Sequence, residues 1–185
     1  SAAPTATPTA TPTTAGPTAT PTATGTPTAT RTPTVTRTPT PTRTPTPTVP
    51  AGQQTITFND KAGQDQPLTG AYPAGVADWG PDGWYHAGPW GPLTTKSASF
   101  GGPGQTSAAF TFLTPRRVIS VRAYNGGGAA TTVTLACAGN PTKTESVPAG
   151  QVATISTGWT VACTTVTVGS SNGWDTNFDD VVHAG

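Results

Sequence analysis

The chain has 185 residues, and its composition divides it into two unlike parts. Residues 1–50 contain 22 Thr and 12 Pro, whereas all aromatic residues, both cysteines and all 8 acidic residues lie in the rest. That remainder is the size of one ordinary domain, which excludes a two-domain cofactor enzyme. No apolar run approaches the ~20 residues of a membrane-spanning helix, so we expect no membrane insertion.

Charge is sparse along the whole chain. Charged residues make up 9% of it, against about a quarter in typical proteins. Neither part has the dense lysine and arginine face that phosphate backbones require, so nucleic acid is excluded as a partner. A surface built from Thr, Ser, Gly, Asn and Gln is typical of secreted proteins, and it suits uncharged, hydroxyl-rich ligands.

Residues 1–52 are predicted to form an extended linker. Pro-Thr and Pro-Thr-Ala-Thr units recur there, and from Arg31 the unit becomes Arg-Thr-Pro-Thr. Proline every two to six residues fixes φ and removes amide donors, so neither a helix nor a β-ladder can propagate. We expect a polyproline-II linker whose composition suits O-glycosylation. Such a linker normally tethers another domain, so we expect an N-terminal partner domain.

Residues 53–185 are predicted to form an all-β domain. Short runs rich in Val, Ile, Thr and Phe alternate with Gly, Pro and Asn, and no ten-residue stretch has a helical apolar period. This pattern favours a two-sheet antiparallel β-sandwich of jelly-roll-like topology, with an immunoglobulin-like sandwich as the alternative. The predicted strands are 54–59, 96–100, 106–113, 117–124, 130–137, 142–147, 151–156, 163–168 and 176–183.

The two cysteines fall at the ends of predicted strands, Cys137 closing one and Cys163 opening another. In a low-charge chain without methionine and of extracellular type, such a pair is expected to form a disulfide. Two unrelated buried thiols are the alternative. We therefore expect a secreted or cell-surface protein.

The segment 71–92 concentrates aromatic residues among glycines and prolines. Flat rings on a rigid loop suit stacking against sugar rings, with neighbouring polar groups bonding the hydroxyls. Two or three of the five rings are expected to be structural, and Trp174, in a later turn, either joins this face or caps the core. Asp78 and His86 lie close enough to contribute hydrogen bonds. The predicted ligand-binding residues are Tyr72, Trp79, Asp82, Trp84, Tyr85 and Trp90.

Carboxylates stand at both ends of the domain. Strand alternation places Asp60 on the face of Phe58 and Asp180 on the face of Phe178, and an inward carboxylate is costly unless it is paired or bound to a metal. Oxygen ligands of this kind suit a structural Ca²⁺. The alternative is hydrogen bonding to loop amides or pairing with Arg116, Arg117 or Arg122. The candidate calcium ligands are Asp60, Asn177, Asp179 and Asp180.

The sequence Ile-Thr-Phe-Asn-Asp at 56–60 and the sequence Asn-Phe-Asp-Asp-Val-Val at 177–182 bound the domain. Behind a Pro/Thr linker, this arrangement resembles secreted bacterial carbohydrate-binding modules of the galactose-binding-like jelly-roll type. The resemblance implies that the first and last strands lie side by side. It also implies a calcium ion near their ends, at Asn59 and Asp60 and at Asp179 and Asp180.

These patterns favour non-catalytic carbohydrate binding by a tethered extracellular module, with a polysaccharide or other glycan as partner. Hydrolysis of a glycosidic bond usually takes two carboxylates across a cleft, but the domain has a single glutamate, Glu145, and Asp78 and Asp82 share one loop. We therefore expect no enzyme; a small esterase-like or lytic enzyme is a weaker hypothesis. The main alternative is a structural or adhesive surface protein whose heads self-assemble on a glycosylated stalk.

Overall fold

The computed structural model describes residues 52–185, so the linker predicted at residues 1–52 lies outside the described residues except for Gly52. Between residues 52 and 185 the regular secondary structure is almost entirely β-strand, as predicted. Its one helical element is the 3-10 turn η1 (Gly173–Asp175). This part of the chain has no helix long and apolar enough to span a membrane.

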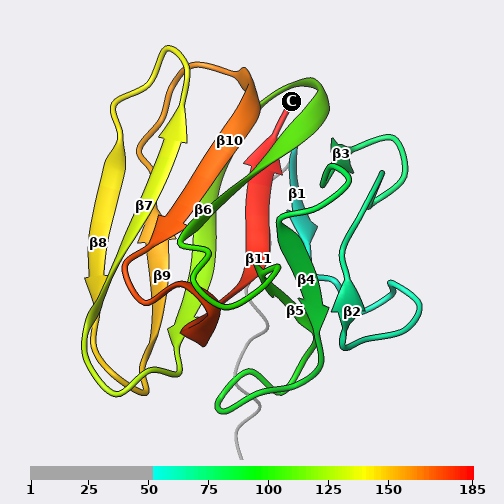
Figure 1. The fold of residues 1–185 in the computed structure, drawn as a ribbon. Helices are drawn as coiled ribbons and strands as arrows, with labels where there is room; N and C mark the ends of the chain where they lie inside the picture. Colours follow the sequence, from blue (N-terminus) through cyan, green and yellow to red (C-terminus); the bar gives the residue numbers. More distant parts are fainter. Residues whose placement is uncertain (1–51) are drawn as a thin grey trace, which may run out of the picture. The chain divides into compact units, whose positions relative to one another are not determined.

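Eleven strands pair antiparallel in two layers (Figure 1). In chain order they are β1 (Gln53–Ile56), β2 (Gln66–Pro67), β3 (Ala77–Asp78), β4 (Trp84–Ala87), β5 (Ser97–Phe100), β6 (Ser107–Asn125), β7 (Thr131–Cys137), β8 (Lys143–Val147), β9 (Val152–Ser156), β10 (Cys163–Ser170) and β11 (Thr176–Ala184).

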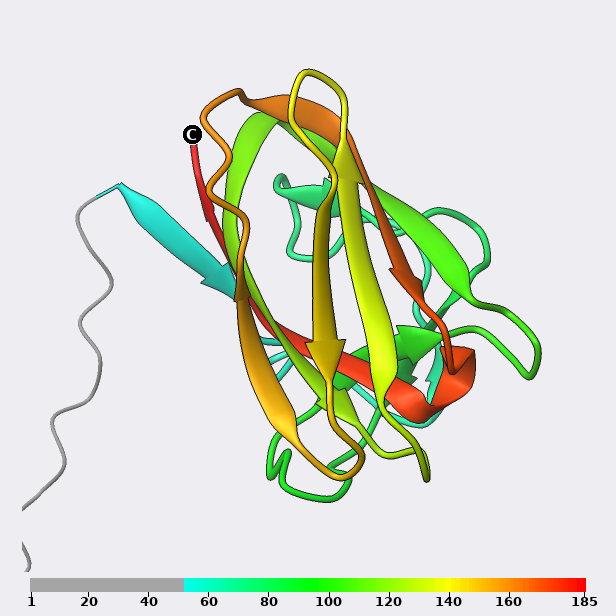
Figure 2. The ribbon, with the colours of Figure 1, turned by 90° about the vertical axis from the view of Figure 1, so that its left-hand side faces the viewer.

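The first layer has the order β2-β4-β5-β11-β6-β9, and the second has the order β3-β6-β10-β7-β8. Figure 2, viewed from the β8 side, shows β7 and β8 in front of β11. The predicted two-sheet antiparallel β-sandwich is therefore confirmed. β1 pairs with β11, from Gln53 opposite Ala184 to Ile56 opposite Val181, so the first and last strands lie side by side.

β6 is one strand where the sequence predicts two, 106–113 and 117–124. The prediction divides it at Pro115, but proline is tolerated in a strand at a bulge. The register of β6 against β10 shifts near this proline, since Cys163 lies opposite Arg116 but Thr165 lies opposite Thr111. The first half of β6 pairs with β10 and the second half with β11, so the strand crosses from one layer to the other.

The core lies between the layers and is rich in aromatic rings. Phe110 and Phe112 of β6 are both buried and contact each other edge to face, with ring centroids 5.2 Å apart. Trp79 stacks on Phe110 at 4.8 Å and meets Trp84 edge to face at 5.1 Å. This cluster fills the sandwich behind β4 and β5, which leaves the outer faces of those strands free for other side chains.

Cys137 and Cys163 form the predicted disulfide, with a Cα–Cα distance of 6.2 Å and a sequence separation of 26. The disulfide and the all-β domain are compatible with an extracellular protein. In the chain-entropy model, a loop of this length corresponds to about 3.5 kcal/mol of stabilisation. We expect Cys137→Ala/Cys163→Ala to lower the free energy of unfolding by about that amount in urea denaturation. An unchanged midpoint and slope would contradict this.

Candidate functional site

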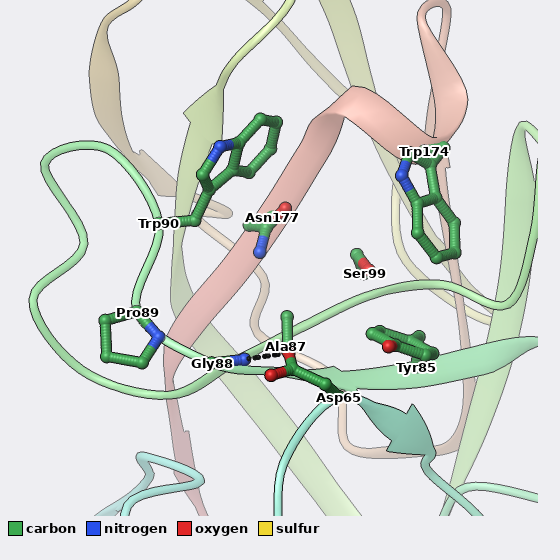
Figure 3. A pocket seen from close by; sticks show the side chains of 9 residues that line it. All are labelled: Asp65, Tyr85, Ala87, Gly88, Pro89, Trp90, Ser99, Trp174 and Asn177. Carbon is green, nitrogen blue, oxygen red and sulfur yellow. Dashed lines mark hydrogen bonds between the residues drawn. The ribbon is translucent and has the colours of Figure 1, made fainter.

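A pocket of about 270 Å³ opens on the outer face of the first layer. This volume lies just below the usual range for ligand pockets, so the pocket suits a group the size of one ring. Figure 3 shows its lining, which is aromatic at two sides and polar between them. The lining residues are Asp65, Tyr85, Ala87, Gly88, Pro89, Trp90, Ser99, Trp174 and Asn177.

The floor of the pocket belongs to a row of side chains in register across four strands, of which Tyr85, Ser99 and Asn177 line the pocket and Tyr124 continues the row to Trp90. Tyr85 of β4 lies opposite Ser99 of β5, Ser99 lies opposite Asn177 of β11, and Asn177 lies opposite Tyr124 of β6. Because successive side chains of a strand point to opposite faces, these four point outward while Trp84, their inward neighbour, enters the core. The row spans three strand spacings, about 14 Å.

A tryptophan packs against each end of this row. Trp174, carried by η1, contacts Tyr85 with ring centroids 5.1 Å apart and an interplanar angle of 51°. Trp90 contacts Tyr124 edge to face at 5.3 Å. The exposed fractions of Trp90 and Trp174 are 40% and 37%, so each ring keeps a free surface. In Figure 3 the two indoles lie on opposite sides of Asn177 and Ser99.

The loop after β4 holds Trp90 in place. Trp90 and Leu93 exchange two backbone hydrogen bonds, of 3.0 and 3.1 Å, and the Leu93 side chain is buried. Gly91 has φ +57°, and a side chain there would collide with Tyr124. The Trp90 ring lies so close to Gly126 that a Cβ on that glycine would be 2.2 Å from it. These close approaches position the indole before any ligand arrives.

The turn that carries Trp174 is fixed by backbone and side-chain contacts. Gly173 has φ +56°, and a Cβ there would lie 2.5 Å from the carbonyl oxygen of Gln105. The Asn172 amide donates to Asn125 Oδ1 at 2.6 Å, and its Oδ1 accepts a hydrogen bond from Ser170 at 2.8 Å. Trp174 therefore projects from a rigid corner.

Two polar groups of the pocket are oriented by hydrogen bonds. Asn177 Nδ2 donates to Ser97 Oγ at 2.8 Å, which fixes the plane of the Asn177 amide. Asp65 Oδ1 accepts from the backbone N–H of Gly88 at 3.0 Å, the bond drawn in Figure 3. The Asp65 N–H donates to the carbonyl of His86 at 2.6 Å, so its carboxylate is held at the rim. Acceptors and donors thus lie between the two indoles.

The structure brings only two of the six predicted ligand-binding residues, Tyr85 and Trp90, into this pocket. Trp79 and Trp84 belong to the core instead, with exposed fractions of 1% and 2%. Trp79 Nε1 donates to the carbonyl of Tyr72 at 2.6 Å, and Trp84 Nε1 donates to that of Ala109 at 2.7 Å. Neither ring has a free face, so neither can stack on a ligand.

Tyr72 and Asp82 lie elsewhere. The half-buried Tyr72 packs on Phe58, with ring centroids 5.9 Å apart, and its hydroxyl donates to Asp60. Burial raises the pKa of Tyr72. Asp82 is exposed beside residues 101–105, in a different hollow.

The two other polar residues predicted near the aromatic segment serve the fold. Asp78 Oδ1 accepts from the backbone N–H of Gly80 at 2.8 Å, an ordinary turn contact. His86 is fully buried in β4, and burial lowers its pKa. The prediction that His86 contributes hydrogen bonds to a ligand is therefore wrong, because its strand turns it inward next to the outward-facing Tyr85.

Sequence reasoning missed Asp65 and Ser99 and left Trp174 undecided. The signal for Ser99 is present in the alternation of β5, where Ala98 and Phe100 face the core. Asp65 gives no such signal, because it belongs to the pocket only through its hydrogen bond to Gly88.

The carboxylates at the domain ends lie differently from the predicted inward pair. Asp180 has φ +47°, and the register of β11 against β6 shifts between Asp179 and Val182. Asp179 precedes the bulge, keeps the phase of Asn177 and is buried beside Thr95, whereas the bulge turns Asp180 away from the core and leaves it half-buried. Asp60 is exposed, because the chain has left β1 after Ile56. The prediction that Asp60 and Asp180 point inward is wrong.

The four candidate calcium ligands do not form one ligand set. Within residues 52–185 no group of three or more His, Cys, Asp or Glu side chains is placed to hold a metal ion. We assign no role to calcium. The four instead have separate partners: Asp60 accepts from Tyr72, Asn177 donates to Ser97, Asp179 accepts from Thr95 at 2.9 Å, and Asp180 pairs with Arg122 at 3.5 Å.

Asp179→Asn is expected to stabilise the domain at neutral pH. Burial raises the pKa of Asp179 from 3.8 to about 6, so the cost of its ionisation to folding grows as the pH rises above 3.8 and is complete above about 6. Asparagine keeps an acceptor for the Asp180 N–H, and its amide can donate to the Thr95 hydroxyl.

The expected gain for Asp179→Asn is up to about 3 kcal/mol at pH 7.5. It shrinks as the pH falls through 6 and vanishes below 3.8, where the wild-type carboxyl is protonated in both states. Thermal melts across this range measure the difference, with the exposed Asp82→Asn as control. A gain that is independent of pH would contradict the assignment.

Comparison of the chain with models of known protein families, with curated proteins and with solved structures finds no match. Function is therefore inferred from the geometry of the pocket.

Proposed function

We propose that the domain binds carbohydrate, without catalysis, in the pocket between Trp90 and Trp174. The observation that carries this proposal is the pair of exposed, positioned indoles at the two ends of a polar floor. The C–H face of a sugar ring packs on an indole, and its hydroxyls need nearby donors and acceptors such as Ser99 and Asn177. The resemblance inferred from the sequences at 56–60 and 177–182 points to the same function.

Binding is favoured over hydrolysis by the chemistry of the lining. Glycosidases usually flank the scissile bond with two carboxylates. Among the nine lining residues Asp65 is the one carboxylate, and its Oδ1 already accepts from Gly88. We propose that the protein acts outside the cell, where its disulfide is stable.

Co-sedimentation with insoluble cellulose, xylan and chitin, together with a soluble glycan array, tests the proposal on the full chain. Wild-type protein is expected to bind at least one neutral or amine-bearing glycan, and Trp90→Ala or Trp174→Ala is expected to weaken it. Leu113→Ala is the matched control, because Leu113 is 51% exposed but lies outside the pocket lining. Equal binding by all variants would contradict the assignment of carbohydrate binding to this pocket.

A head-to-head assembly is the second candidate, since it would bury the same two exposed indoles. Sedimentation velocity over a range of concentrations separates the two candidates. Carbohydrate binding alone predicts a monomer at all concentrations, whereas assembly predicts a dimer that Trp90→Ala/Trp174→Ala disrupts.

A further inference from the structure

The pocket carries a single charged side chain, and its charge is negative. Asp65 is the one charged residue among the nine that line it, and no Lys, Arg or His joins it there. The ion pairs of residues 52–185 are Arg122 with Asp180 and Lys143 with Glu145, so Asp65 has no cationic partner in this part of the chain. An anionic ligand would meet an unpaired carboxylate, and a cationic ligand would supply the missing partner.

The Asp65 carboxylate is positioned as well as unpaired. Asp65 adopts φ +56°, its N–H is bonded to His86, and its Oδ1 accepts from Gly88. Its Oδ2 contacts only the neighbouring Gln64 amide, at 3.2 Å, on the exposed side. The backbone contacts hold the carboxylate at the rim, and Oδ2 keeps capacity for a ligand donor.

The aromatic rings also favour a cationic ligand. The face of an indole or phenol ring carries negative electrostatic potential and attracts ammonium groups. Trp90 and Trp174 stand at the two sides of the pocket and Tyr85 lies in its floor, and in Figure 3 Asp65 lies below the two indoles, between Gly88 and Tyr85. A ligand that carries an ammonium group on a sugar ring would therefore gain both from the carboxylate and from the rings.

Resting on the function proposed above, we propose that the pocket prefers amino sugars with a free ammonium group, such as β-linked glucosamine oligomers. Neutral sugars use the indoles and the hydroxyl partners alone and bind more weakly. Glycans built from uronic acids or sulfated sugars are rejected, because their charge would approach Asp65 without a compensating cation. Asp65 is the residue that sets this order.

Isothermal titration of the full chain with oligomers of equal length tests the proposal. The probes are glucosamine, N-acetylglucosamine, glucose and galacturonic acid oligomers. At low salt and about pH 5.5, where the glucosamine amines are protonated, the glucosamine oligomer is expected to bind about five- to tenfold more tightly than the neutral ones. This preference shrinks at high salt because exposed charges are screened. The galacturonate oligomer is expected to bind most weakly of all.

Asp65→Asn is expected to weaken binding of the glucosamine oligomer several-fold more than binding of the neutral oligomers, which shrinks the preference to the part that the aromatic rings supply. Asp82→Asn is the control, because it removes one exposed carboxylate outside the pocket and should keep the preference. Equal affinity for charged and neutral oligomers, or an unaltered preference in Asp65→Asn, overturns this inference and leaves the proposed function standing. Binding of none of the oligomers overturns both. If Asp65→Asn does not fold, the ligand series and its salt dependence on wild-type protein decide.

Discussion

Trp84→Ala is expected to lower the free energy of unfolding by about 3–5 kcal/mol, as is typical when a buried tryptophan is truncated. Trp84 is 2% exposed and contacts Phe100, with ring centroids 5.6 Å apart. It also contacts Phe178 at 6.2 Å and donates its indole N–H to the Ala109 carbonyl. Alanine would leave a large cavity and an unsatisfied carbonyl at the point where β4, β5, β6 and β11 meet.

Urea denaturation followed by circular dichroism measures this loss. Trp174→Ala is the matched control, since it removes the same side chain from the surface and is expected to change stability by about 0.5 kcal/mol or less. If Trp84→Ala unfolded at the wild-type urea concentration, the placement of this ring in the core would be wrong.

Trp174→Ala is expected to have the opposite profile, with at least a tenfold loss of glycan affinity and little change in stability. Its ring packs on Tyr85 and presents a free surface to the pocket. Buried aromatic anchors at binding sites are commonly worth about 2 kcal/mol or more, which exceeds a tenfold change in affinity. Trp90→Ala is expected to behave in the same way, since Trp90 forms the other wall.

Titration calorimetry with the best glycan of the panel measures this loss, and thermal melts of the same samples show that the fold is retained. A Trp174→Ala protein that binds normally would remove this indole from the site. A loss of both binding and stability would instead show that the turn at Gly173–Asp175 is part of the folding core.

The all-β class, most strands and the disulfide could be predicted because each leaves a local pattern. The alternation of Val133 and Leu135 with polar residues marks β7 without any knowledge of its neighbours. β2 and β3 escaped prediction because two-residue strands have no period. β4 escaped prediction because it has four residues between Gly83 and Gly88, and its aromatic residues are interpreted from the sequence as part of a loop.

The pocket could be predicted only in part because its floor is assembled from three strands, of which β11 lies far from β4 and β5 in sequence. Nothing local shows that Tyr85 and Asn177 both lie opposite Ser99, a fact of register. The bulge at Asp180 could not be predicted either, because no pattern of residue types indicates that this aspartate adopts a positive φ. The adjacent residues Trp84 and Tyr85 therefore point to opposite faces of the sheet, and the pairing of β4 decides which of the two faces the core.

The most direct test of carbohydrate binding in this pocket is a glycan titration of the full chain beside its Trp90→Ala/Trp174→Ala double variant. We expect saturable binding of a neutral or amine-bearing glycan by the wild-type protein. We expect no measurable binding by the double variant at an unchanged melting temperature. Equal binding by the two proteins, or no binding of any glycan by the wild type, would contradict the assignment of carbohydrate binding to the pocket between these two tryptophans.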